Sequence, residues 1–424
     1  MTICFYEDEK YRQFFPLTLT RPVYTLRAGI VPLFQRGERY FRTAKVCLTA
    51  RDQIAPLVSE TFSQYPVNII KRSEDDVLFI NGRIRAYADL PELIREARLS
   101  TIFINQNEAV AVLFKAASME NLPSLSTQKE YEYLFRKDSS VITSLETTAT
   151  MYNYCWEIMA DIETEIHEDF MHLKQSFPRT DDASIHDGAY VVDRGNTFFG
   201  QGVEVLPGAI IDASQGPVYI GAGTRIEPHA AIAGPCFIGH DSVVLAGKIT
   251  ASSIGRTSRV GGEVEESVFH GYVNKYHAGF IGHSYVGQWV NFGAMTTNSD
   301  LKNNYSSIRL TLNGRMIDSS SIKVGSFIGD HTKFGIGTLL NTGINIGVCC
   351  NVFGGTLIAD REIPSFSWGN SQKWERYQFD KAIETAQRTT QRRNCTLSDR
   401  EVAVLKTIFD KTDSDEGIMR FNET

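Results

Sequence analysis

The sequence has no run of about 18 apolar residues, so no transmembrane helix is predicted. Its first residues, MTICFYEDEK, do not resemble a secretory signal. Seven cysteines are scattered along 424 residues and none forms a C-x-x-C pair, which argues against a disulfide framework or a zinc ribbon. These absences predict a cytoplasmic protein that does not act at a membrane.

Positive charge is also scarce, since 43 Lys and Arg face 50 Asp and Glu and the net charge is −7. A broad basic surface for nucleic acid is therefore not expected. Glycine is rare at the start of the chain, where only Gly29 and Gly37 occur in the first 60 residues. A glycine-rich phosphate loop is thus missing from the place where nucleotide-binding α/β domains usually have one.

The first third of the chain alternates short apolar runs with polar stretches. Strands are expected at 2–6, 45–50, 67–70, 77–80 and 101–105, and a helix at 90–99. This alternation predicts an open α/β sheet. A connecting helix is expected within 150–177, because this stretch lacks Gly and Pro and carries apolar residues at helical spacing.

A six-residue period governs the chain from about residue 186 to 357. Two series carry it: Ile220, Ile226, Ile232, Ile238, Val244 and then Ile328, Phe334, Leu340, Ile346, Val352. Such a period predicts a parallel β-helix of about eight or nine coils, in which each flat face buries one aliphatic side chain. The period alone does not reveal the hand of the coil.

The repeat is interrupted twice, at 261–280 and at 299–323, and interruptions of a solenoid often form its binding face. Asn313-Gly314 within RLTLNGRMID predicts a β-hairpin. After the repeat, helices are expected at 371–390 and 398–410, with Ser398 and Glu401 as a capping box. These helices would cap the open end of the solenoid.

Polar residues gather between the two interruptions, in NKYHAGFIGHSYVGQWVNFGAMTTNSDLKNNY (274–305). This segment, the N-terminal FYEDEKYRQFFPLTLTRPVYTLRAGI and the late FIGDHTKFGIGTLLNTGINIGV resemble a divergent branch of one family of bifunctional enzymes. That family combines UDP-N-acetylglucosamine pyrophosphorylase with glucosamine-1-phosphate N-acetyltransferase. The resemblance extends over nearly the full chain.

The resemblance implies a nucleotidyltransferase-like (Rossmann-like) α/β domain at 1–149, a linker helix at 150–182, a left-handed β-helix at 183–368 and a helical cap at 369–424. It implies a homotrimer with active sites between neighbouring solenoids. The substrates would be acetyl-CoA with an amino-sugar phosphate, and UTP with a sugar 1-phosphate. Mg²⁺ would assist nucleotidyl transfer.

His277 precedes Asn291 by fourteen residues, as the catalytic base of the family precedes an Asn. An imidazole suits this task, because a sugar amine must lose a proton before it attacks a thioester. The resemblance further implies two sets of binding residues. The sugar phosphate would contact Lys275, Asn291, Asp300, Lys302, Asn303 and Tyr305, and acetyl-CoA would contact Ala294, Gly347 and Val348.

Nucleotide binding is expected, by resemblance, at Thr18, Thr20, Arg21 and Arg27, and at Asn81-Gly82 after a strand. Arg83 stands where a metal-binding Asp is usual, so Glu7, Asp8 or Asp89 would have to hold Mg²⁺. A zinc site built from three His residues is not expected, since His277 and His283 are six residues apart and that pattern needs five.

Three functions therefore remain open. The first is a bifunctional enzyme of sugar-nucleotide synthesis. The second is an acyltransferase whose nucleotide-binding domain has degenerated. The third is a trimeric scaffold or regulatory subunit without catalysis.

Overall fold

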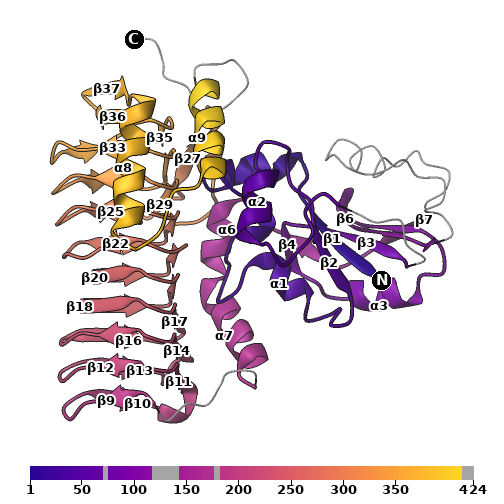
Figure 1. Cartoon of the computed structure of the whole chain (residues 1–424), viewed down its shortest axis with the longest axis horizontal. Coiled ribbons are helices and arrows are strands. Elements are labelled where there is room, and N and C mark those ends of the chain that lie inside the picture. Colours follow the sequence, from indigo (N-terminus) through magenta and orange to yellow (C-terminus); the bar gives the residue numbers. More distant parts are fainter. Residues whose placement is uncertain (70–74, 117–142, 176–181, 413–424) are drawn as a thin grey trace. The chain divides into compact units, whose positions relative to one another are not determined.

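The computed structural model describes residues 1–69, 75–116, 143–175 and 182–412 (Figure 1). It divides into two compact units. The first comprises Met1–Phe14, Thr20–Leu26 and Val31–Tyr154, and the second comprises Phe15–Leu19, Arg27–Ile30 and Cys155–Thr424. Two short N-terminal segments thus belong to the second unit. No helix in the described ranges is long and apolar enough to cross a membrane.

The first unit is built on a six-stranded sheet in the order β2-β1-β3-β6-β5-β7. Its strands are β1 (Thr2–Tyr6), β2 (Lys45–Leu48), β3 (Val77–Asn81), β5 (Thr101–Asn105), β6 (Glu108–Phe114) and β7 (Thr143–Glu146). The expected strand at 67–70 is wrong in its described part, where Val67 forms only an isolated bridge to Leu48. Strand β6 was not expected and runs antiparallel between β3 and β5.

Short helices of three to seven residues connect these strands. They are η1 (Glu9–Phe14), η3 (Val23–Thr25), α1 (Leu33–Gly37), α2 (Ala55–Thr61) and α3 (Leu90–Glu96), whereas η2 (Leu17–Leu19) belongs to the second unit. A small antiparallel pair, β4 (Ile84–Ala86) with β8 (Thr150–Met151), closes the unit. The expected connecting helix is in fact two helices, α6 (Cys155–Ala160) and α7 (Ile162–Leu173). The α/β fold predicted for this part of the chain is confirmed.

The second unit is dominated by a β-solenoid, which confirms the prediction from the six-residue period, and its coils number about ten where eight or nine were expected. Each coil contributes a strand to three parallel stacks, and η4 (Arg194–Asn196) interrupts the first coil. The first stack contains β9 (Ser184–Ile185), β12 (Glu204–Val205), β15 (Arg225–Ile226), the starts of β18 (Val243–Thr250) and β20 (Arg259–Glu265), β22 (Asn274–Lys275), β25 (Asn291–Phe292), β30 (Lys333–Phe334), β33 (Asn351–Val352) and β36 (Ser367–Asn370).

The other two stacks complete the coil. The second contains β10 (Tyr190–Val192), β13 (Ile210–Asp212), β16 (Ala230–Ala233), the ends of β18 and β20, β23 (Phe280–Gly282), β26 (Thr297–Asn298), β31 (Leu339–Leu340) and β34 (Leu357–Ile358). The third contains β11 (Thr197–Phe199), β14 (Val218–Ile220), β17 (Cys236–Ile238), β19 (Ser253–Ile254), β21 (Val268–Phe269), β24 (Tyr285–Val286), β29 (Ser326–Ile328), β32 (Ile344–Ile346) and β35 (Glu362–Ile363). Their inward aliphatic side chains form one continuous buried core.

The apparent interruption at 261–280 is a change of coil length. Asn345 pairs with Phe327 across a full step of 18 residues, whereas Val268 pairs with Ser253 after 15 and Tyr285 pairs with Val268 after 17. The chain stays within the solenoid, and only the phase of the period shifts. The second interruption does leave the coil, as a hairpin of β27 (Arg309–Leu312) and β28 (Arg315–Asp318) around Asn313-Gly314.

After the solenoid, β36 forms a β-hairpin with β37 (Lys373–Arg376), so the helix expected at 371–390 begins only at Phe379. This helix, α8 (Phe379–Gln391), is followed by α9 (Asp399–Lys411). The Glu401 backbone N–H donates to Ser398 Oγ at 3.2 Å, which confirms the predicted cap. The Glu401 carboxylate instead hydrogen bonds His331 Nε2 at 2.8 Å, so it ties α9 to the solenoid. In Figure 1, α8 runs along the first stack near β25 and β33.

Candidate functional site

Two edges of the solenoid carry four of the predicted site residues: His277 and Ala294 on one, Gly347 and Val348 on the other. The His277 edge consists of the corners that join the first stack to the second, at 276–279, 293–296 and 335–338. The Tyr272 edge consists of the corners that join the third stack to the first, at 270–273, 287–290 and 329–332. The strands of the first stack separate the two edges.

His277 lies exposed at its corner between β22 and β23. The next residue accepts a hydrogen bond at Ala278 O from the Met295 N–H of the following coil, at 2.9 Å. The predicted base and Ala294, a predicted acetyl-CoA contact, therefore occupy adjacent corners of one edge. Gly347 and Val348 lie instead at the Tyr272 edge, where Val348 is buried.

Lys275 is not positioned as a surface ligand for phosphate. Its side chain occupies an inward position of the first stack and is only 1% exposed. Its Nζ donates to Gly261 O and Gly279 O at 2.7 Å each and to His277 O at 3.3 Å. Burial lowers the pKa of Lys275 to about 8, although Glu263 opposes this. The ammonium therefore fixes the backbone of the His277 corner from inside the solenoid.

His283 lies between two carboxylates. Its Nδ1 is 2.7 Å from Asp300 Oδ2 and its Nε2 is 3.1 Å from Glu266 Oε2. Burial lowers the pKa of His283, but the hydrogen bonds to Asp300 and Glu266 outweigh burial and raise the pKa to about 9. His283 is therefore protonated near neutral pH and is unsuited to act as a base.

The Asp300 carboxylate is thus paired with His283. The other predicted sugar contacts, Lys302, Asn303 and Tyr305, lie on the loop that follows. Lys302 Nζ donates to Ser307 O at 2.6 Å, and Tyr305 is 68% exposed. Asn303 is also exposed. This loop presents polar side chains to solvent, whereas the partly buried Asp300 is held by His283.

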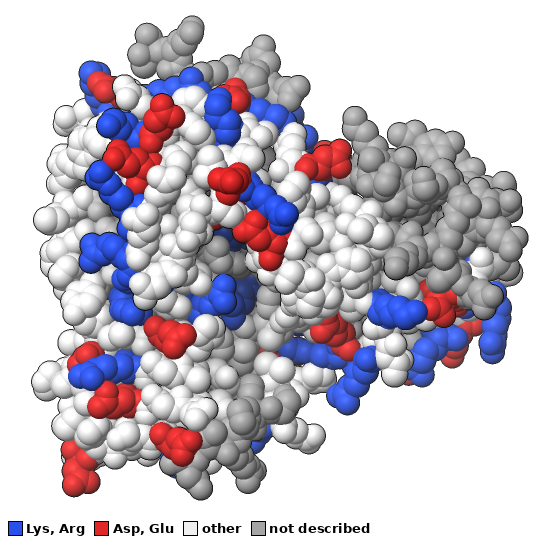
Figure 2. Space-filling model, in the orientation of Figure 1, with Lys and Arg blue, Asp and Glu red and all other residues white. Residues whose placement is uncertain are grey.

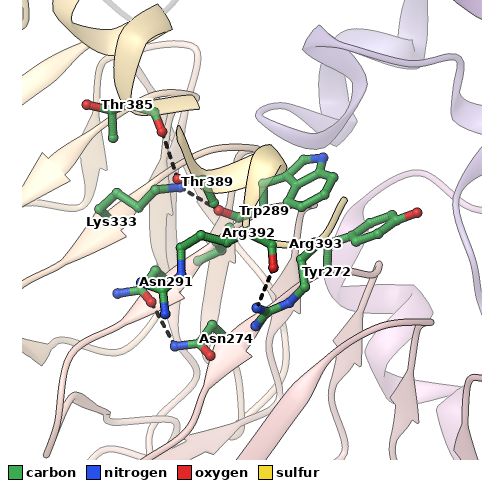
Figure 3. Close-up of a pocket in the computed structure, with 10 residues that line it drawn as sticks. Tyr272, Asn274, Trp289, Asn291, Lys333, Thr385, Thr389, Arg392 and Arg393 are labelled. Atoms are coloured by element: carbon green, nitrogen blue, oxygen red, sulfur yellow. Dashed lines mark hydrogen bonds between the residues drawn. The ribbon is translucent and has the colours of Figure 1, made fainter. Parts of the chain in front are cut away.

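Asn291 faces a cavity of about 340 Å³ between the first stack and α8, which we call the α8 pocket (Figure 3). Asn274 Nδ2 donates to Asn291 Oδ1 at 2.8 Å. The pocket is lined by Tyr272, Asn274, Trp289, Val290, Asn291, Lys333, Thr385, Thr389, Arg392 and Arg393. Apart from Asn291, none of these residues was expected at a site. The Arg392-Arg393 pair directly after α8 is the signal that could have indicated them.

In the first unit, Arg83 follows β3 and is completely buried. It donates to both oxygens of Asp8 at 2.9 and 2.6 Å, to Glu108 Oε2 at 2.8 Å and to Tyr152 O at 2.7 Å. Burial would lower the pKa of Arg83, but Asp8 and Glu108 together raise it. The guanidinium therefore neutralises the two carboxylates nearest to the end of β3.

The residues at this edge do not fit a magnesium ion. Asp8 is paired with Arg83, Glu7 Oε2 lies 3.0 Å from Arg51 Nε, and Asp89 accepts from Thr147 Oγ1 at 2.6 Å. All three acids suggested as substitutes for the usual metal ligand thus already have partners. Over the described ranges, no group of three or more His, Cys, Asp or Glu is placed to hold a metal ion.

The predicted nucleotide residues are divided between the two units. Thr20 and Arg21, largely buried, and Asn81-Gly82 belong to the first unit, whereas Thr18 and Arg27 belong to the second. Asn81 Nδ2 donates to Asp8 Oδ2 at 2.9 Å, and its Oδ1 accepts from the Arg83 N–H.

Gly82 and Arg27 have clear packing roles. A Cβ at Gly82 would lie 2.9 Å from Tyr6 O and from Tyr24 Cβ, so close approach requires glycine there. Arg27 packs over the Phe237 ring at 5.1 Å, and its backbone N–H donates to Tyr285 Oη at 2.8 Å. Burial lowers the pKa of Arg27.

Two curated proteins are similar to part of this chain. The chain is 31% identical over 96 residues to a bifunctional sugar-1-phosphate nucleotidylyltransferase/acetyltransferase of Sulfurisphaera tokodaii, covering 23% of this chain and 24% of the relative. It is 27% identical over 103 residues to the bifunctional protein GlmU of Methanocaldococcus jannaschii, covering 24% and 25%. The chain thus spans about a quarter of the length of these curated relatives.

Among solved structures, the UDP-N-acetylglucosamine acyltransferases of Campylobacter jejuni and Arabidopsis are similar at 11% and 14% identity, with TM-scores of 0.26 and 0.30. They cover 56% and 55% of this chain and 100% and 99% of their own. With scores this low, these similarities carry no argument about function. Residues 3–177 match the family model described as sugar nucleotidyl transferase, and the divergent branch suggested by the motifs remains an expectation.

Proposed function

We propose that this protein is a transferase of sugar-nucleotide synthesis, whose solenoid transfers an acetyl group from acetyl-CoA to an amino-sugar phosphate. The supporting observation is the combination of two features in one chain. The first is the sugar nucleotidyl transferase match over residues 3–177. The second is a β-solenoid on which His277 and Ala294 occupy adjacent corners. Both curated relatives carry names that describe bifunctional proteins.

In the proposed acyl transfer, His277 Nε2 or Nδ1 accepts a proton from the sugar ammonium, and the free amine attacks the thioester carbonyl. The carbonyl oxygen becomes an oxyanion, which the Ala294 backbone N–H stabilises. The intermediate then collapses to an amide as the carbon–sulfur bond breaks; the attacking nitrogen loses one proton, and the departing CoA thiolate takes one up. Exposed Asn303 and Tyr305 and the partly buried Lys302 would contact the sugar phosphate. Asn291 faces the α8 pocket instead.

His277→Ala tests this assignment. We expect kcat for acetyl transfer to glucosamine 1-phosphate to fall about 100- to 10,000-fold, as it does when a general base is lost. KM for acetyl-CoA should change little. His240→Ala is the matched control, because His240 is half-exposed at the Tyr272 edge of the solenoid and pairs with Asp241. A folded His277→Ala protein with more than about a third of wild-type turnover would exclude this role.

Nucleotidyl transfer from UTP to a sugar 1-phosphate is the second proposed activity, with Thr20, Arg21 and Asn81 at the nucleotide site. The Arg83 contacts with Asp8 and Glu108 favour a second candidate, an acyltransferase whose nucleotide-binding domain has degenerated. Release of pyrophosphate from UTP and glucosamine 1-phosphate or its acetylated form distinguishes the two. Absence of both activities and of ligand binding would favour a non-enzymatic scaffold.

We also propose a homotrimer that associates along the His277 edge. Large apolar side chains are exposed along this edge and on the adjoining second stack, including Tyr276, Met295, Ile336, Leu339 and Leu357. Aligned apolar exposure of this kind marks association surfaces. A monomeric mass in sedimentation equilibrium at micromolar concentration would contradict this proposal.

A further inference from the structure

We propose that the α8 pocket is a binding site for a small phosphorylated anion, such as pyrophosphate or a phosphate ester of a sugar. This site is separate from the proposed acyl-transfer centre. The pocket begins at the Tyr272 edge, and the first stack separates it from the His277 edge. Only Asn291, on the strand between the two edges, is shared with the predicted acyl-transfer residues.

The charge of the pocket is the first argument. Lys333, Arg392 and Arg393 line it, and none of its ten lining residues carries a carboxylate. Arg388, one turn earlier on α8, provides the contrast, because its Nη2 lies 2.6 Å from Glu384 Oε1. Basic side chains that converge on a cavity without an acidic partner favour a ligand with more than one negative charge.

Unsatisfied hydrogen-bonding capacity is the second argument. Arg393 Nε is buried and has no hydrogen-bond partner, while its Nη1 reaches only Arg392 O, at 3.4 Å. Burial lowers the pKa of Arg393, and the neighbouring Arg259 and Arg392 lower it further. A buried donor without a partner is costly, and a bound anion would satisfy it.

Lys333 contributes a third cation from the floor of the pocket. Its Nζ donates to Trp289 O at 2.6 Å, which holds the ammonium in place. Burial lowers the pKa of Lys333 to about 8, although Cys349 and Asp330 oppose this. An anion in the pocket would favour the charged form of this lysine and would therefore bind more tightly below pH 8 than above it.

The walls of the pocket limit the size of the ligand. Tyr272 and Trp289 stack with ring centroids 4.0 Å apart, and Arg256 covers the Tyr272 ring at 5.2 Å, so this wall is held on two sides. A volume of about 340 Å³ is at the small end of known ligand sites. Asn274, Asn291 and the hydroxyl oxygens of Thr385 and Thr389 supply neutral polar groups for the rest of a small phosphate ester.

Calorimetric titration of the full chain with sodium pyrophosphate, inorganic phosphate and glucose 6-phosphate tests the proposal. Arg393→Gln and Arg392→Gln should each weaken binding of the tightest probe by about 10- to 100-fold, as expected when a charge-assisted hydrogen bond is lost. Arg388→Gln is the matched control and should stay within about twofold, because its partner is Glu384. Comparison of the three probes distinguishes free phosphate species from a phosphate ester.

The proposal is overturned if none of the probes binds at about 10 mM, or if Arg392→Gln and Arg393→Gln both bind like the wild type. If Arg393→Gln does not fold, probe binding by Arg392→Gln alone tests the proposal, since Arg392 is exposed. The His277→Ala protein should bind the probe as the wild type does. Retained acyl transfer in His277→Ala would contradict only the proposed function, and absent probe binding in the wild type would contradict only the pocket proposal.

Discussion

The clamp around His283 leads to a specific prediction about stability and pH. His283 is held between Asp300 and Glu266, and its pKa is raised from 6.5 to about 9. Because the folded state binds this proton more tightly than the unfolded state, the clamp stabilises the fold. The stabilisation is complete below about pH 6.5 and is lost as the pH rises through 9.

The magnitude follows from the size of the shift. A change of one pKa unit corresponds to about 1.4 kcal/mol, so a shift from 6.5 to about 9 is worth at most about 3 kcal/mol. The His283 side chain is only 7% exposed, so solvent screens the pair weakly. On the acidic side, the hydrogen bond from His283 lowers the pKa of Glu266 despite its burial. The contact between His283 and Glu266 should therefore persist to a lower pH than the ordinary pKa of a glutamate would allow.

Urea unfolding of the wild type and of His283→Gln from pH 6 to 9.5 measures this contribution. The stability difference between the two proteins should shrink by up to about 3 kcal/mol across this range. Lys275 and Lys333 also titrate here, but they do so in both proteins and cancel in the difference. His240→Gln controls for an exposed histidine beside an acid. Parallel pH profiles, or a His283 pKa near 6.5 by NMR, would refute the reasoning.

Two further predictions concern the cations that are buried in each unit. If UTP binds, its affinity should be the same with Mg²⁺ and with EDTA, because Arg83 already neutralises Asp8 and Glu108. A tenfold gain in affinity on adding Mg²⁺ would contradict this. Lys275→Met should lower the free energy of unfolding by about 1–3 kcal/mol in thermal unfolding, because Gly261 O and Gly279 O lose their donor. It should also lower kcat for acyl transfer more than Lys302→Met does. Unchanged stability of Lys275→Met would show that the carbonyls find other donors.

The sequence by itself was sufficient for the architecture of the solenoid. An aliphatic side chain at every sixth position can be buried only if the chain turns after each short strand, so Ile220 to Val244 predicted the coil directly. The turn chemistry of Asn313-Gly314 and the cap at Ser398 are equally local, and both are present in the structure. Local patterns of this kind need no knowledge of distant residues.

Only the tertiary structure decided the roles of the charged residues. Lys275 occupies a core position because coils of 15 and 17 residues shift the phase of the repeat, and a fixed period of six cannot reveal that shift. The partners of Arg83 come from positions 75 residues before and 25 residues after it, and α8 brings Arg393 onto strands more than 50 residues earlier in the chain. A charged side chain acquires its role from the partners that folding brings within a few ångströms, and its own neighbours in sequence do not specify them.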